Sequence, residues 1–303
     1  MNAPPTTEDR IWAVIAHLSA LAFGMGIVLP VVGWSDQRRK SKYGSFQSLQ
    51  ALGYQSLGYT IWVLFSAVAA IIFVTIMLAA LDAGERNGGN TKALLEIWMS
   101  IYVAFLLGLM GIYILFPILA AISCAFGKEF RYPILGKRLA QYLGYDSTLK
   151  PEEQAWLNED HEFRWVAAMG HFSILVILWG MLAPLTVWTL YGKRSPFLKF
   201  QSIQTLVYQA GVTILYVGTV FISLFVMIIF AFMGWMGNVT TYSPMGIVGI
   251  IALGGSLLIT IIILLCVPLL HILGQWAGYR VLKGDNYRYP LVGRLVEKRL
   301  LKG

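Results

Sequence analysis

The stretch FQSLQALGYQ, at residues 46–55, recurs as FQSIQTLVYQ at residues 200–209. Seven of the ten positions are identical, and each copy carries three glutamines at the start of a long apolar run. A polar pattern that returns at the same place in an apolar sequence indicates an internal repeat. The pattern therefore predicts that the chain contains two copies of one unit.

The repeat extends well beyond this stretch. At a constant offset of 154, Arg10–Gln55 aligns on Arg164–Gln209 without a gap, and 16 of 46 positions are identical. A second block closes each half, where GKEFRYPILGKRL from Gly127 matches GDNYRYPLVGRLV from Gly284. We expect repeats at residues 1–144 and 164–303. Between them, residues 145–163 carry the acidic stretch PEEQAWLNEDHEF and are expected to form a polar linker.

The composition predicts a membrane protein. The chain is 57% hydrophobic and 13% charged, with a mean hydropathy of +0.68. A helix needs about 20 apolar residues to cross the hydrocarbon layer, and six runs meet that length. They are Ile11–Trp34, Leu49–Leu81, Ile97–Phe126, Trp165–Leu190, Leu206–Met236 and Gly246–Val281. We predict an all-α polytopic integral membrane protein with no cleaved signal peptide, because no basic stretch precedes the first run.

The basic residues suggest how the runs cross. If the first and fourth runs each enter and leave by one face, 21 of 23 Lys and Arg lie on one side, and Arg86 and Lys92 lie on the other. This count favours four full spans plus two interrupted or re-entrant segments over six plain spans. The first run also contains GMGIVLP, which weakens a helix. We place the protein in the inner membrane of a prokaryote, with termini and basic loops cytoplasmic. The net charge of +8 is attributed to these loops and their contact with the lipid bilayer, not to nucleic acid.

Few polar residues lie deep in the apolar runs, and they do not form a catalytic pattern. The sequence has no HExxH, GxSxG, phosphate-binding Gly-rich loop or paired carboxylates, so we expect no enzyme and no metal site. His17 and His171 are repeat-related. We expect each to bond to a Gln, a Ser or the backbone of its own copy, and hence no cofactor. The alternative is that the two imidazoles hold one haem iron axially.

The repeated polar residues are the candidate structural or interaction residues. The glutamines lie where a basic loop becomes a membrane helix. They can fix helix packing within each copy, or bond headgroups, the freed backbone of the interrupted segment, or the matching tail. The RYP blocks are expected to stop the third helix at the interface, before a basic amphipathic stretch. The candidates are His17, His171, Gln47, Gln50, Gln55, Gln201, Gln204, Gln209, Arg131, Tyr132, Pro133, Arg288, Tyr289 and Pro290.

These motifs also carry a resemblance. HLS, then a proline and tryptophan, then KRSPFLKFQSIQTLVYQ and a closing G…YRYP resemble a bacterial family of uncharacterised membrane proteins. That family is related to the channel subunit of the chloroplast inner-envelope (Tic) import translocon. The resemblance covers most of both copies, although the first copy has KSKYGSFQSLQ and lacks the SPF proline. It implies a role in protein translocation or in the assembly of a membrane complex.

Three functions follow as hypotheses. The first is a non-enzymatic scaffold, assembly factor or accessory subunit that packs against other integral membrane proteins. The second is a translocation or small-solute conduit at the interface of the two copies. The third is a haem-binding electron carrier that uses His17 and His171. The apolar runs are poor in polar groups that line a water path, which favours the first hypothesis.

Overall fold

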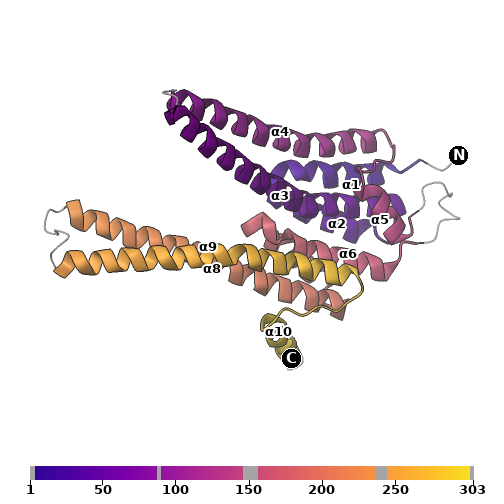
Figure 1. Ribbon diagram of the computed structural model, residues 1–303. Helices are drawn as coiled ribbons and strands as arrows, with labels where there is room; N and C mark the ends of the chain where they lie inside the picture. The colour runs from indigo at the N-terminus through magenta and orange to yellow at the C-terminus, as the bar shows by residue number, and fades with distance from the viewer. Residues whose placement is uncertain (1–3, 87–89, 146–155, 236–243, 301–303) are drawn as a thin grey trace.

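The computed structural model describes residues 4–86, 90–145, 156–235 and 244–300 and is all-helical in these ranges (Figure 1). The first copy contains α1 (Thr7–Leu18), η1 (Ser19–Ile27), α2 (Val28–Gln37), α3 (Lys42–Arg86), α4 (Thr91–Ala125) and α5 (Leu135–Leu143). The second contains α6 (Glu159–Phe172), η2 (Ser173–Met181), α7 (Leu182–Tyr191), α8 (Pro196–Trp235), α9 (Pro244–Leu282) and α10 (Val292–Leu300). The predicted all-α membrane fold with tandem repeats is confirmed.

The long helices form two hairpins that extend from a common base (Figure 1). We call residues 58–86 with 91–112 the first arm, residues 213–235 with 244–269 the second arm, and the other described residues the base. The 45 residues of α3 span about 68 Å. Its residues 44–53 are buried in the base, whereas the exposed apolar side chains begin at Ile61. The hydrocarbon layer is about 30 Å thick, so the arm alone is long enough to cross it.

Five stretches of the described chain are long and apolar enough to cross a membrane. They are Thr7–Gln37, Lys42–Arg86, Thr91–Ala125, Pro196–Phe232 and Gly246–Leu282.

The first of these stretches folds back on itself. Phe23, with φ 49° and ψ −138°, interrupts the helix inside η1, and α2 returns beside α1. The Gln37 amide donates to Glu8 at 3.3 Å, and Lys40 Nζ lies 3.4 Å from the same carboxylate. Because its two ends lie together, Thr7–Gln37 forms a hairpin and not one straight span. This is the interrupted arrangement that the basic residues favour.

The second copy has the same re-entrant hairpin. The ring of Phe163, near the start of α6, lies 6.0 Å from that of Tyr191, which ends α7. In both copies a glycine allows the tight return. A Cβ at Gly26 would lie 1.7 Å from the Ser19 carbonyl oxygen, and one at Gly180 would lie 2.0 Å from that of Ser173. Glycine is required where backbones approach this closely.

The two copies point the same way, because both arms extend toward one end of the molecule (Figure 1). They are not packed as a symmetric pair. The α3 helix of the first copy packs on α6 and η2 of the second, whereas α8 makes no comparable contact with α1 among the described residues. The core of the base lies at this one-sided interface and takes side chains from both copies.

Candidate functional site at the junction of the two copies

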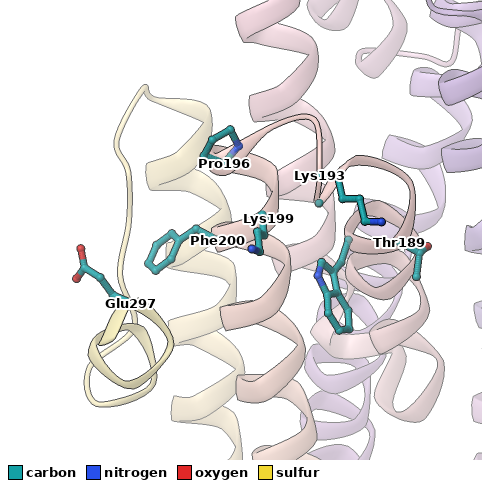
Figure 2. A pocket seen from close by; sticks show the side chains of 8 residues that line it. Thr189, Lys193, Pro196, Lys199, Phe200 and Glu297 are labelled. Carbon is teal, nitrogen blue, oxygen red and sulfur yellow. The ribbon is translucent and has the colours of Figure 1, made fainter. Parts of the chain in front are cut away.

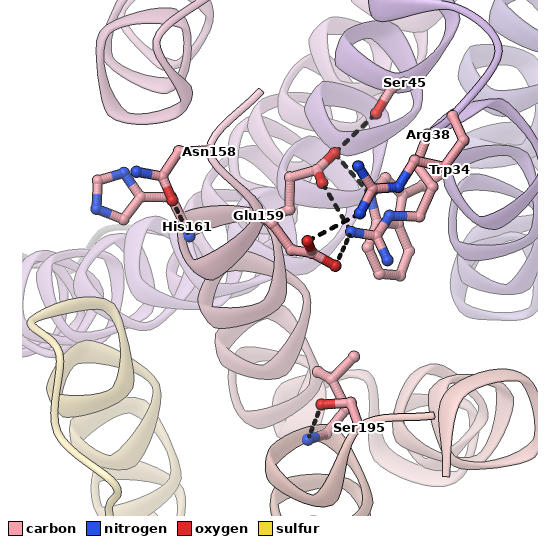
Figure 3. A network of polar contacts seen from close by, with 10 residues as sticks. Trp34, Arg38, Ser45, Asn158, Glu159, His161 and Ser195 are labelled. Carbon is pink, nitrogen blue, oxygen red and sulfur yellow. Dashed lines mark hydrogen bonds and ion pairs between the residues drawn. The ribbon is translucent and has the colours of Figure 1, made fainter. Parts of the chain in front are cut away.

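The end of α2 meets the start of α6 in a buried ion-pair network (Figure 3). Arg38 Nη2 lies 3.2 Å from a Glu162 carboxylate oxygen and 2.9 Å from Glu159. The other Glu162 oxygen accepts hydrogen bonds from Trp34 Nε1 at 3.2 Å and from Ser45 Oγ at 3.1 Å. Arg38 and Glu162 are both buried. A buried charge pair needs such additional hydrogen bonds to offset desolvation, and here they are present.

The two carboxylates differ in environment. Burial raises the pKa of Glu162, against the opposing effects of Arg38, Trp34 and Ser45. Hydrogen bonds from Arg38 and Arg39 lower the pKa of the half-exposed Glu159. Both residues lie in the first turn of α6, where the partial positive charge of the helix end favours anions. The α6 N-terminus is therefore held on the first copy by charge.

Aromatic side chains surround this network. The Arg38 guanidinium lies 4.6 Å from the Phe163 ring, and the Trp34 and Tyr191 rings stack at 4.8 Å. Deeper in the interface, Trp165 Nε1 donates to the Leu49 carbonyl at 3.0 Å. The junction thus combines a buried charge pair with close ring packing, an arrangement suited to holding the copies in one orientation.

Within the first copy, the predicted polar residues form one connected group. His17 Nε2 lies 2.9 Å from the Gln47 amide oxygen and Nδ1 lies 3.0 Å from the Tyr132 hydroxyl. Because an amide oxygen only accepts, Nε2 donates to Gln47 and Nδ1 accepts from Tyr132. Gln47 and Gln50 both donate to the Phe130 carbonyl, at 3.1 and 2.9 Å, and Gln50 accepts from the Tyr132 backbone N–H at 2.8 Å. The group therefore ties the closing block to α1 and α3.

The second copy repeats the group with small changes. His171 contacts the Gln201 amide oxygen at 3.0 Å and the Tyr289 hydroxyl at 2.9 Å. Gln204 donates to the Tyr287 carbonyl at 2.8 Å and accepts from the Tyr289 N–H at 3.2 Å. In both copies each imidazole has both ring nitrogens engaged by protein groups. Iron ligation would require breaking one of these bonds, so the geometry favours the structural interpretation over haem.

The third glutamine of each stretch bonds the interrupted segment. Gln55 donates to the Ala16 carbonyl at 3.2 Å and to Ser19 Oγ at 2.9 Å. Gln209 donates to the Gly170 carbonyl at 2.8 Å. These carbonyls lie where the first helix of each copy gives way to the 3₁₀ segment. Of the three expected targets of the glutamines, the structure thus has the freed backbone and the tail.

The remaining candidates lie in the RYP blocks. Tyr132 stacks on Tyr54 at 4.1 Å, and Tyr289 stacks on Tyr208 at 3.9 Å. Outside this stack, Arg131 pairs with Glu129, Arg288 pairs with Glu297 at 2.7 Å, Pro133 lines an apolar cavity and Pro290 is exposed. After each proline comes an exposed residue with positive φ, at 134 (63°) and 291 (66°). The amphipathic helices α5 and α10 follow directly.

Comparison with known protein families shows which family the two copies belong to. The magnetosome magnetite crystal formation protein family (MamF/MmsF) matches residues 8–139 and 162–296, most of the chain in two segments. The chain belongs to this family. No curated protein and no solved structure matches it.

The MamF/MmsF match corrects the expected resemblance to the Tic-related family. That resemblance rested on HLS, FQSIQTLVYQ and YRYP. In the structure, Gln204 of FQSIQTLVYQ accepts a hydrogen bond from the backbone of Tyr289 in YRYP, inside the second copy. His17 of HLS bonds to Gln47 and Tyr132 inside the first copy. Such motifs describe how a unit of this kind is held together, and they did not distinguish one family from another.

The junction residues of this MamF/MmsF chain are not among the predicted candidates. The expected polar linker, residues 145–163, includes the start of α6, and residues 146–155 lie outside the described residues. An acidic run usually forms a solvated surface, so NEDHEF gave no sign that Glu162 is buried. The available signal was the difference between copies, because Arg38 aligns on Gly192 and Ser45 on Lys199.

The face that receives α6 in the first copy has an open counterpart in the second. Trp188, Lys193, Lys199 and Phe200 line a cavity of about 950 Å³ between α7, α8 and α10 (Figure 2). Glu297 of α10 lies at its edge. Trp34 is fully buried, whereas its counterpart Trp188 is 40% exposed. This face is therefore covered in the first copy and open in the second.

Proposed function

We propose that this chain is a non-enzymatic scaffold of the magnetosome membrane, which supports magnetite crystal formation by holding membrane components in position. The proposal rests on a difference between the base and the arms. The buried histidines and glutamines of the base bond to protein groups, while the outer surface of both arms is apolar and exposed. The arms expose large side chains over most of their length, among them Ile71, Leu107, Phe221 and Leu265.

An apolar arm surface suits contact with lipid and with other membrane helices. In membranes, helices associate by close packing and not by burial from water, so an arm can bind a partner without a polar site. We propose other integral membrane proteins as the partners. The base, which carries nearly all Lys and Arg, is proposed to face the cytoplasm, with Arg86 and Lys92 at the opposite end.

The conduit hypothesis receives less support. A conduit needs a polar lining. A cavity of about 770 Å³ lies where the two copies meet beside the arms. Its lining is mainly apolar and aromatic, with side chains such as Ile61, Phe116 and Trp165, and also includes Arg138 and Lys283. Gln50 and Gln204, which could offer polar groups to such a path, are bonded within each copy.

The test uses cells that lack the chain. We expect their magnetite crystals to be altered in size or number and to recover when the wild-type chain is supplied. A variant with the exposed pair Phe221→Ala and Phe225→Ala should reach the membrane in normal amount but rescue less well. The matched control is Phe126→Ala, which is exposed at the end of α4. Unaltered crystals in cells without the chain, or single-channel currents from the purified chain in planar bilayers, would contradict the scaffold proposal.

A further inference from the structure

The contact between the two copies is used only once in this chain. On the first copy, the receiving face consists of Trp34, Ser45, Phe46, Leu49 and Gly53, all buried beneath the second copy. Its repeat counterparts are Trp188, Lys199, Phe200, Ile203 and Val207. None of these is buried, and Val207 is 45% exposed where Gly53 is covered by Trp165.

The inserting surface shows the same imbalance. On α6 it consists of Glu162, Trp165 and Met169, which are all buried. Their counterparts on α1 are Glu8, Ile11 and Ile15, and all three are exposed. Ile11 is 52% exposed, against 6% for Trp165. Ile11 and Ile15, on the exposed side of α1, thus occupy the positions through which α6 binds the first copy.

Each copy therefore carries one inserting surface and one receiving face, and the chain pairs one of each. Where α3 meets α6 and η2 the contact is heterologous, which leaves a complementary surface free at either end. The α2 and α7 helices also meet across the junction, as do η1 and η2. We propose that α1 of a second copy of this chain docks on the receiving face of α7 and α8, so that the protein associates head to tail in the membrane plane.

Side-chain volume supports this pairing. Within the chain, Trp165 occupies the space above Gly53, where a Cβ would lie 2.4 Å from its ring. At the two free surfaces, Ile11 stands in place of Trp165 and Val207 stands in place of Gly53. A smaller inserting residue thus meets a larger receiving residue, which conserves the filled volume. Volume-conserving exchanges are the ones that packed interfaces tolerate best.

Charge supports the pairing as well. Ser45, which donates to Glu162 at 3.1 Å, aligns on Lys199, and Glu162 aligns on Glu8. An inserted Glu8 would thus meet a cation, with Lys193 on the same face. The acidic residue at this cavity, Glu297, is already paired with Arg288 at 2.7 Å. Glu8 contacts Gln37 and Lys40 of its own copy at 3.3 and 3.4 Å and is exposed.

Membrane geometry permits the contact. The inserting and receiving surfaces both lie in the base, and both copies point the same way (Figure 1). A second chain that repeats the internal contact is therefore at the correct depth and in the correct orientation. Repetition gives a ring if the rotation closes and a filament if it does not.

The biological purpose of this self-association rests on the proposed scaffold function, whereas the contact itself does not. The test is made on the purified full chain in mild detergent, by light scattering after size-exclusion chromatography. We expect dimers and larger assemblies that increase with protein concentration. Ile11→Trp should weaken association about tenfold or more, because two large side chains cannot share the site. Ile71→Trp, which is exposed on the first arm and lies outside the base, is the matched control and should change nothing.

Two further measurements make the test specific. Val207→Gly should weaken association, and combining it with Ile11→Trp should restore it, because the pair recreates Trp165 over Gly53. A mixture of Ile11→Trp and Val207→Trp should give dimers and nothing larger, since one variant retains the receiving face and the other the inserting surface. Unchanged circular dichroism and thermal unfolding exclude loss of fold.

A monomeric wild type at all concentrations, an Ile11→Trp variant that associates normally, or a mixture that stays monomeric would overturn the proposal. If cells that lack the chain have altered crystals but the purified chain is monomeric, the scaffold function stands and only self-association is removed. If the purified chain forms assemblies but cells that lack it have unaltered crystals, self-association stands and the scaffold function is removed.

Discussion

The two copies have the same internal hydrogen bonds but differ in what covers their equivalent faces. His17 and His171, and the glutamines beside them, make nearly the same contacts. Trp34 and Trp188 are the same residue at the same repeat position, yet one is buried at the junction and the other lines an open cavity. The comparison teaches that contacts inside each copy specify the unit. The packing of one copy on the other instead uses a face that is covered in the first copy and open in the second.

The largest expected effect tests this difference directly. Trp34→Ala removes a fully buried ring and should lower the free energy of unfolding by about 3–5 kcal/mol. Trp188→Ala, at the half-exposed counterpart, should change it by about 0.5 kcal/mol or less. Denaturant unfolding in detergent, at a concentration where the chain is monomeric, provides both values. Equal losses would show that the copies have equivalent environments.

The buried charge pair comes next. Arg38→Met leaves the Glu162 carboxylate buried without its cation and should lower stability by about 3 kcal/mol. Combined with Glu162→Gln, it should cost less than the sum of the single changes, because the partners are coupled. A strictly additive double-mutant cycle would mean that Arg38 and Glu162 do not interact in the folded protein. Position 192 offers the natural contrast, since the second copy has glycine there.

The glutamines should behave alike in both copies. Gln50→Leu and Gln204→Leu each leave a backbone N–H of the closing block without its acceptor, at Tyr132 and Tyr289. Each change should cost about 1–3 kcal/mol, the price of an unpaired buried polar group. The two losses should agree within about 1 kcal/mol, because the bonds are internal to each copy. A loss confined to one copy would contradict the equivalence of the two units.

The histidines are expected to show the smallest effects. His17→Leu and His171→Leu should each lower stability by about 0.6–2 kcal/mol through lost interhelical hydrogen bonds. His→Gln at either site should cost less, because the amide can still donate and accept. A Soret band that disappears in either Gln variant would instead assign the pair to haem.

The sequence predicted the repeat unit well because its polar residues stand out against apolar runs and return at fixed offsets. The basic residues likewise predicted the re-entrant hairpins, since charge distribution follows sidedness. The junction was beyond such reasoning. Trp34 and Trp188 are identical in the sequence, so only the packing of one copy on the other separates them. Glu162 lies in an acidic run whose usual place is water, and its burial depends on Arg38, which is 124 residues away.

The family assignment was missed for a related reason. The motifs that suggested a Tic-related family are the hydrogen-bonding residues of the unit, and they report its fold more than its function. The match to the MamF/MmsF family over both copies provides what the motifs did not.

The central claim is that two parallel copies each carry a re-entrant hairpin, and labelling of single cysteines tests it most directly. The background lacks Cys124 and Cys266, and single cysteines replace Lys40, Asn90, Arg194 and Pro244. Sealed membrane vesicles are treated with an impermeant thiol reagent before and after permeabilisation. The account predicts that positions 40 and 194 label from one side of the membrane, and positions 90 and 244 from the other. Labelling of positions 40 and 194 from opposite sides would mean that six segments cross, and would contradict the account.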